Sequence, residues 1–119
     1  MVDTNLAKKE SEFAEIIWDN EPISSPELVK LAEEKLNWKK STTYTMLKIL
    51  CKKGIFKNEK AVVSKVVSKD EFGFLKGKRL IEENFNGSLP AFMTAFTSRT
   101  KLSENEIKDL YELLDSYMK

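Results

Sequence analysis

The chain contains no histidine and a single cysteine, Cys51, among its 119 residues. Zinc sites are built mainly from cysteine and histidine, and Ser-His or Cys-His nucleophile pairs need an imidazole. One cysteine cannot form an internal disulfide. Gly-rich phosphate loops are also missing. We therefore expect no metal site, no cofactor and no catalytic residue, and the sequence predicts a protein that is not an enzyme.

Long apolar runs are absent as well. No stretch approaches the roughly 20 apolar residues that a membrane-spanning helix needs, and the first residues, Met-Val-Asp-Thr-Asn, do not resemble a signal peptide. We expect a cytoplasmic protein without membrane insertion. Apolar residues still make up 41% of the chain, which is enough for the core of one domain, or of a small domain with an assembly element.

The charges are segregated along the chain, although the formal net charge is only +1. Residues 1–34 contain three lysines and nine acidic residues, residues 35–60 contain eight lysines and one glutamate, and residues 61–119 are balanced. A basic block of this kind is typical of proteins that contact nucleic-acid phosphates. The alternative is a lysine-rich surface that is merely solvated.

The basic block contains the pattern of a helix-turn-helix motif, with helices over residues 25–36 and 41–53. Ser25, followed by Pro26, is expected to cap the first helix, and Ser41 and Thr42 are cap-type residues at the start of the second. Gly54 is expected to end the second helix in the left-handed conformation. A second helix with this spacing can lie in the major groove of DNA.

Two sets of DNA-contacting residues follow from this motif. Leu47, Leu50 and Cys51 are expected to point inward, and we interpret Cys51 as a small core residue rather than a redox switch. The polar residues of the second helix are expected to face the bases: Ser41, Thr42, Tyr44, Thr45 and Lys48. Packing of Tyr44 on the wing is the alternative for that residue. The surrounding lysines are expected to bind phosphates: Lys39, Lys40, Lys52, Lys53, Lys57 and Lys60.

The flanking segments extend the motif to a winged helix. A helix is expected over residues 8–20, and a hairpin is expected around the polar stretch 57–60. The run around Asn37 and Trp38 is a candidate third strand. The fold class predicted is mainly α with a small β-wing, in which residues 1–69 form a winged helix-turn-helix DNA-binding domain.

Residues 70–119 are expected to form a helical dimerisation region. One helix ends at Asn86-Gly87, the next is capped by Ser88, and the last begins with the capping box Ser103-Glu-Asn-Glu106. About fifty residues with so many large apolar groups cannot enclose them alone, so a second copy is expected to cover them. The residues expected at this homodimer interface are Phe85, Phe92, Met93, Phe96, Ile107, Leu110, Tyr111, Leu114 and Tyr117.

Three segments resemble the penicillinase repressor (BlaI/MecI) family, to which the copper-responsive CopY-type repressors are related. They are Glu12–Trp18, Trp38–Gly54 and Lys101–Leu110. The resemblance implies a dimeric winged-helix repressor that binds an inverted-repeat DNA operator and controls antibiotic (β-lactam) resistance genes. It also implies base contacts early in the recognition helix, at Ser41, Thr42, Tyr44 and Thr45.

The chain departs from the family pattern at several places, two of which bear on the inducing signal. In β-lactam-responsive members a membrane sensor protease triggers cleavage at an Asn-Phe bond, and this chain has Ala95-Phe96 at the matching place. Ala95-Phe96 is therefore the candidate cleavage site and a membrane sensor protease system a candidate partner, but induction by that route is expected to be altered or absent. The copper-responsive relatives end in paired cysteine motifs, which are missing here. Two other functions stay open: a winged-helix adaptor for a protein partner, and a small-molecule-gated regulator.

Overall fold

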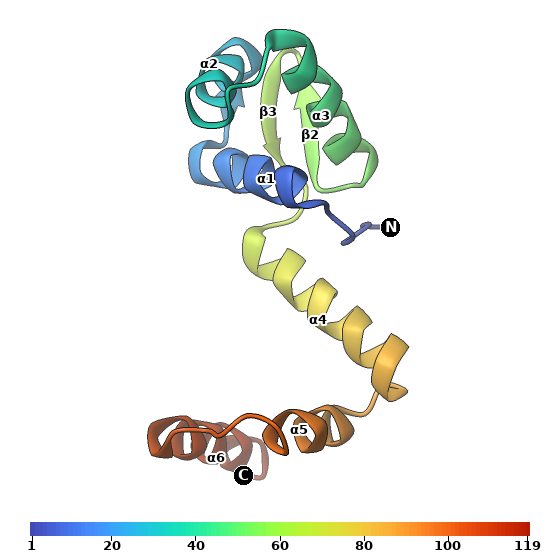
Figure 1. Cartoon of the computed structure of the whole chain (residues 1–119), viewed down its shortest axis with the longest axis vertical. Coiled ribbons are helices and arrows are strands. Elements are labelled where there is room, and N and C mark those ends of the chain that lie inside the picture. The colour runs from blue at the N-terminus through green and yellow to red at the C-terminus, as the bar shows by residue number, and fades with distance from the viewer. The chain divides into compact units, whose positions relative to one another are not determined.

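A computed structural model describes all residues, 1–119, and contains six helices and one three-stranded sheet (Figure 1). The chain forms two compact units, Met1–Gly77 and Lys78–Lys119. The predicted fold class is confirmed: the first unit is a winged helix-turn-helix and the second is entirely helical.

Three helices and the sheet enclose the core of the first unit. The helices are α1 (Lys8–Asn20), α2 (Ser25–Leu36) and α3 (Lys40–Lys52). Their apolar faces meet at fully buried side chains such as Phe13, whose ring lies 5.0 Å from that of Trp38. This packing fixes α3 against the rest of the unit, because a close-packed core allows few alternative arrangements.

The starts of α2 and α3 differ from the predicted caps. Ser24, not Ser25, caps α2, since the Glu27 amide donates to the Ser24 hydroxyl at 3.3 Å. Helix α3 begins at Lys40, and its N-cap residue, Lys39, makes no capping hydrogen bond with its side chain. The expectation that Ser41 and Thr42 are caps is therefore wrong; both lie within the first turn, where their hydroxyls are left for other partners.

The predicted hairpin is confirmed, but the third strand lies elsewhere. Strands β1 (Ile23–Ser24), β2 (Phe56–Glu59) and β3 (Val62–Lys65) pair antiparallel in the order β1-β3-β2. The expected strand at Asn37 and Trp38 is wrong, because Asn37 ends α2 in the left-handed conformation (φ 57°) and Trp38 packs on the core.

The turn of the wing is shorter than the polar stretch 57–60 suggested. Strand β2 continues to Glu59, and only Lys60 and Ala61 form the turn, both with positive φ (52° and 62°). A two-residue turn with two positive φ angles matches the right-handed twist of a hairpin. The wing is therefore a short, tight hairpin with Lys60 at its tip.

The second unit contains the helical ends that the sequence predicted. Helix α4 (Lys69–Phe85) ends at Asn86 and Gly87, both with positive φ, and α5 (Leu89–Thr97) and α6 (Glu104–Tyr117) follow. The hydroxyl of Ser103 accepts from the Glu106 amide at 3.1 Å, and the Ser103 amide donates to the Glu106 carboxylate at 3.0 Å. No helix of the chain is both long and apolar enough to cross a bilayer.

The sequence pattern changes near residue 69, where α4 begins. The boundary between the two compact units lies later, between Gly77 and Lys78 within the same helix. Phe72 explains the difference. Its side chain is buried in the core of the first unit, against the ring of Trp18 at 5.4 Å. The first turns of α4 therefore belong to the first unit.

Candidate nucleic-acid interface

One face of α3 is firmly anchored in the core. Thr43, Leu47 and Leu50 are buried, and the Thr43 hydroxyl donates to the Lys39 carbonyl at 3.1 Å. Gly54 ends the helix with φ 83°, as predicted, and the Ile55 amide donates to the Leu50 carbonyl at 3.2 Å. These contacts leave the opposite face of α3 as a fixed exposed surface.

The N-terminal segment closes over the end of α3 and engages Lys53. The Asp3 amide donates to the Lys53 carbonyl at 2.9 Å, and the Lys53 ammonium donates to the Asn5 carbonyl at 2.7 Å. The same ammonium lies 3.1 Å from the Glu10 carboxylate. Hydrogen bonds from the Ala7 amide and from Lys53 hold the pKa of Glu10 below its usual value. Lys53 is thus committed to contacts within the fold.

Four of the five residues expected to face the bases are exposed on α3: Ser41, Thr42, Thr45 and Lys48. The side chains of Ser41 and Thr42 make no hydrogen bond within the chain, whereas the Thr45 hydroxyl donates to the Ser41 carbonyl at 2.9 Å and keeps its lone pairs free. Ser41 and Thr45 are four residues apart and share one face of the helix. This row can present hydroxyl groups to base edges or phosphates.

Tyr44, the fifth, lies differently. Its ring is half-buried, and its hydroxyl donates to the Ser25 hydroxyl at 3.3 Å. Ser25 is only 5% exposed, and its amide donates to the Ala61 carbonyl in the wing turn at 2.9 Å. Tyr44 therefore connects α3 to the start of α2 and, through Ser25, to the wing. The alternative of packing on the wing is thus met indirectly, through Ser25, whereas the hydrogen bond to Ser25 itself could not be inferred from local spacing because the two residues are 19 positions apart.

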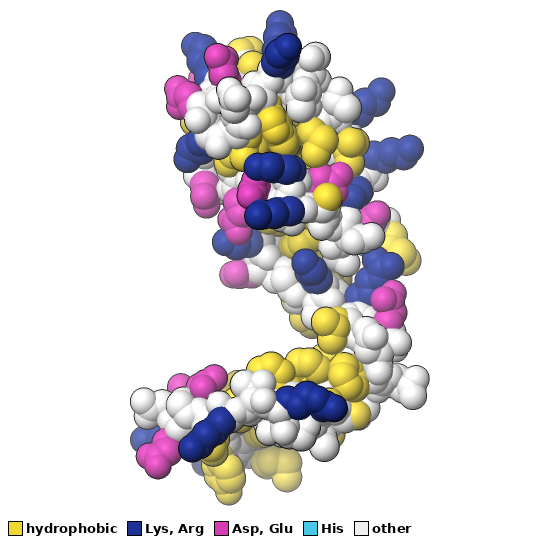
Figure 2. All heavy atoms as spheres, in the orientation of Figure 1, with side chains coloured by type: hydrophobic (Ala, Val, Ile, Leu, Met, Phe, Trp, Pro, Cys, Tyr) yellow, Lys and Arg dark blue, Asp and Glu magenta, His cyan; other side chains and the backbone are white.

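The expected phosphate-binding lysines fall into three groups. Most are exposed and form no ion pair within the chain, namely Lys39, Lys40, Lys52 and Lys60. Lys57 lies 3.6 Å from Glu59, with both side chains more than half exposed, so the pair is weak. Lys53 is engaged by Glu10 and Asn5. Figure 2 shows dark blue side chains projecting from the surface of the first unit, all of them lysines because residues 1–77 contain no arginine.

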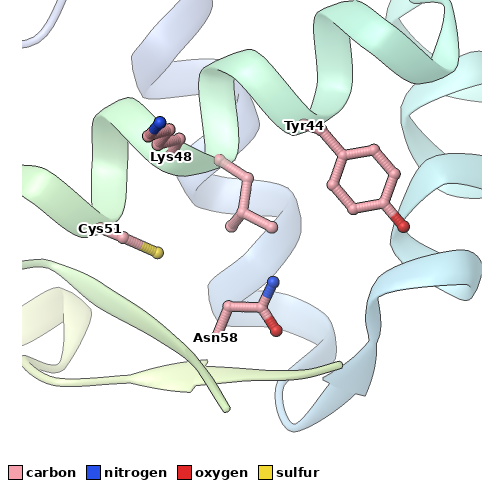
Figure 3. A pocket seen from close by; sticks show the side chains of 5 residues that line it. Tyr44, Lys48, Cys51 and Asn58 are labelled. Atoms are coloured by element: carbon pink, nitrogen blue, oxygen red, sulfur yellow. The ribbon is translucent and has the colours of Figure 1, made fainter. Parts of the chain in front are cut away.

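A hollow of about 390 Å³ lies between α3 and strand β2. It is lined by Tyr44, Leu47, Lys48, Cys51 and Asn58. Figure 3 shows the Cys51 thiol and the Asn58 amide pointing into the space between the helix and the wing, with the Tyr44 ring at one end. Burial raises the pKa of the Cys51 thiol, so this group is neutral near pH 7.

Helices α5 and α6 contain no buried residue. Their apolar side chains gather on the surface in Figure 2, and Ile107, Leu114 and Tyr117 are 52%, 60% and 82% exposed. The rings of Phe85 and Phe92 contact edge to face at 5.5 Å, and those of Phe92 and Phe96 lie tilted at 5.9 Å. The residues expected at the dimer interface are thus all partly or largely exposed in the single chain.

The comparisons with known proteins agree with the geometry of the first unit. The family model described as penicillinase repressor matches residues 6–116. The chain belongs to the penicillinase repressor family. It is 26% identical over 116 residues to the penicillinase repressor of Bacillus licheniformis, covering 94% of this chain and 91% of the relative.

A second relative is the methicillin resistance regulatory protein MecI of Staphylococcus aureus. It is 23% identical over 114 residues, which cover 92% of this chain and 93% of MecI. A match of this extent includes both units. Membership of the penicillinase repressor family places the chain among transcriptional repressors and not among enzymes.

Proposed function

We propose that this penicillinase repressor family member binds an inverted-repeat operator as a cytoplasmic homodimer and represses antibiotic (β-lactam) resistance genes. In this proposal residues 1–69 bind DNA and residues 70–119 hold the dimer together. The names of the two relatives support the class of regulated genes.

The observation that carries the proposal is the exposed row on α3. Ser41, Thr42 and Thr45 stand on a helix fixed by its buried face, and unpaired lysines surround them at the helix ends and on the wing. Hydroxyls of this kind contact base edges, while lysines contact phosphates without regard to sequence. The base-reading set is therefore Ser41, Thr42, Thr45 and Lys48, all of which are exposed on α3.

Two of the expected contact residues change roles in the proposal. Tyr44 positions α3 through Ser25, because its hydroxyl and most of its ring face the protein. Lys53 stabilises the fold, because its ammonium is held by Glu10 and Asn5. The phosphate-binding set is then Lys39, Lys40, Lys52, Lys57 and Lys60.

The homodimer follows from the apolar surface of α5 and α6. A surface of this size needs a cover in water, and a second copy of the same helices offers a self-complementary one. Two winged helices related by a two-fold axis require an operator with matching inverted repeats.

Control by a membrane sensor protease would act at Ala95-Phe96, and we expect this control to be altered or absent. Ala95 and Phe96 lie within α5, where the Ala95 carbonyl accepts from Ser98 and Arg99 side chains. Proteolysis is most frequent in exposed loops rather than in helices. We infer that cleavage at this bond requires the last turn of α5 to open first.

The test is binding of the purified protein to an inverted-repeat sequence from upstream of its own gene and to scrambled DNA, over a salt series. We expect two subunits per site, a clear preference for the operator, and affinity that falls steeply with salt because lysines displace counterions from the phosphates. Equal or absent binding to both DNAs would favour the protein adaptor. A thermal shift with a small molecule that also weakens operator binding would favour the ligand-gated regulator.

A further inference from the structure

The hollow between α3 and the wing has no role in the function proposed so far. It is bounded by α3 residues Tyr44, Leu47, Lys48 and Cys51 on one side and by Asn58 of β2 on the other (Figure 3). Both bounding elements are DNA-contacting elements in the proposed function. The position of the hollow, between them, decides what it can hold.

The course of the DNA backbone past α3 and the wing indicates what the hollow can hold. In the proposed function α3 enters the major groove while Lys57 and Lys60 of the wing contact phosphates, so one sugar-phosphate strand borders that groove on the side of the wing. That strand must pass between the helix and the hairpin. In this protein the space between them is the hollow.

The position of Lys48 on α3 fits this arrangement. Lys48 follows Thr45 by three residues and Tyr44 by four, so its side chain leaves the helix between the base-facing row and the hollow. It is exposed and forms no ion pair within the chain. A hydrogen bond from an unpaired ammonium to a phosphate is stronger than one to a neutral base edge, because the phosphate carries a full charge.

The other lining groups match a deoxyribose-phosphate unit. Asn58 is exposed, and its amide can donate to a phosphate oxygen from the wing side. Leu47 and the small Cys51 side chain offer an apolar floor to the sugar. The Cys51 thiol is neutral near pH 7, because burial raises its pKa, and it therefore does not repel a phosphate.

We propose that the hollow seats one deoxyribose-phosphate unit of the operator, with Lys48 and Asn58 donating to the phosphate and Cys51 facing the sugar. This inference rests on the proposed function and deepens it. It moves Lys48 from the base-facing set to the phosphate-contacting set and adds Asn58 and Cys51 to the DNA interface.

The first experiment uses Cys51 as the only thiol of the chain. Free protein and the operator complex are treated with methyl methanethiosulfonate, and modification is followed by mass spectrometry. We expect operator DNA to slow the modification of Cys51 by tenfold or more, and the methylthio adduct to weaken DNA binding. The control protein keeps Cys51 and also carries Thr100→Cys, which adds a second thiol in the exposed segment after α5. Peptide mass spectrometry distinguishes the two thiols, and DNA should slow the modification of Cys51 but not that at position 100.

Three outcomes would contradict one or both of the proposals. Modification of Cys51 at equal rates in free protein and complex would overturn the hollow as a DNA seat while leaving the repressor intact. Unchanged operator affinity of the methylthio adduct would do the same. Failure of the unmodified protein to bind operator at all would overturn the proposed function, and the seat would fall with it.

The second experiment separates a phosphate contact from a base contact at Lys48. For Lys48→Gln we expect equal loss of affinity on operator and scrambled DNA and a salt slope smaller by about one unit. Asn58→Asp should weaken both DNAs by tenfold or more, since a carboxylate repels phosphate, while Asn58→Ala should cost only a few-fold. Lys108→Gln on α6 is the matched control. Loss confined to the operator for Lys48→Gln would show that Lys48 reads a base and would overturn its place in the seat.

Discussion

The two units of the chain handle their apolar side chains in opposite ways. The first encloses Phe13, Ile17 and Leu28 completely, whereas α5 and α6 leave every apolar side chain partly or largely exposed. The first unit therefore carries its stability within one chain, whereas in the proposed homodimer the second unit obtains it by association. The stability of the second unit should accordingly depend on protein concentration, and that of the first should not.

Phe13→Ala tests the first unit and should have the largest effect on the free energy of unfolding. Phe13 is fully buried beside Trp38, and truncation of such a side chain costs about 3–5 kcal/mol of unfolding free energy. We expect urea unfolding, followed by circular dichroism, to shift accordingly and operator binding to be lost, while sedimentation still shows a dimer. Loss of the dimer in this variant would contradict the separation of roles.

Leu114→Glu tests the associating half. Leu114 is 60% exposed in the single chain, and burial of a leucine at an interface is worth about 1.5–3 kcal/mol, which corresponds to tenfold or more in the dimer dissociation constant. Analytical ultracentrifugation should show more monomer, and operator affinity should fall with it. Glu112→Gln on the same helix is the control and should leave the dimer unchanged.

Thr42→Ala probes reading of the operator without disturbing either half. Its side chain is exposed and makes no hydrogen bond within the chain, so stability should not change. A lost base contact costs about 1–3 kcal/mol on the operator and little on scrambled DNA. Equal affinities of variant and parent for both DNAs, measured by fluorescence anisotropy of labelled duplexes, would remove Thr42 from the reading set.

Lys52 and Lys53 are neighbours with different predicted roles, which makes them a matched pair. Lys52→Gln should reduce the salt slope of DNA binding by about one unit without loss of stability. Lys53→Gln should leave the slope unchanged and lower stability by about 1 kcal/mol, because it removes hydrogen bonds to Glu10 and Asn5. A slope change for both variants would return Lys53 to the phosphate-binding set.

Glu10 should give the smallest effect, and only in part of the pH range. Because the pKa of its carboxyl is lowered in the folded state, the ionised form stabilises the fold above the unfolded-state pKa of about 4.5. This contribution is lost as the pH falls through the lower folded-state value. We expect Glu10→Gln to unfold at a lower urea concentration than the parent at pH 7, and the difference to diminish as the pH falls below 4.5.

The sequence was sufficient for the features that local chemistry determines. Three such features are confirmed: the end of α3 at Gly54, the capping box at Ser103 and the helices of the second unit. Each depends on residues that lie close together in the chain. The third strand was wrong because β1 exists only through its pairing with β3, which lies some forty residues later. The partners of Tyr44 and Lys53 were missed for the same reason: Ser25 and Glu10 are distant in sequence.

The positions of the two tryptophans add a practical property to the molecule. Trp18 and Trp38 both lie in the first unit, where the Trp18 indole donates to the Val67 carbonyl at 3.1 Å and packs on Phe56. The second unit contains no tryptophan and carries Tyr111 and Tyr117 instead. Intrinsic fluorescence excited at the red edge therefore reports on the winged helix alone, so its unfolding can be followed optically in the intact chain without any added label.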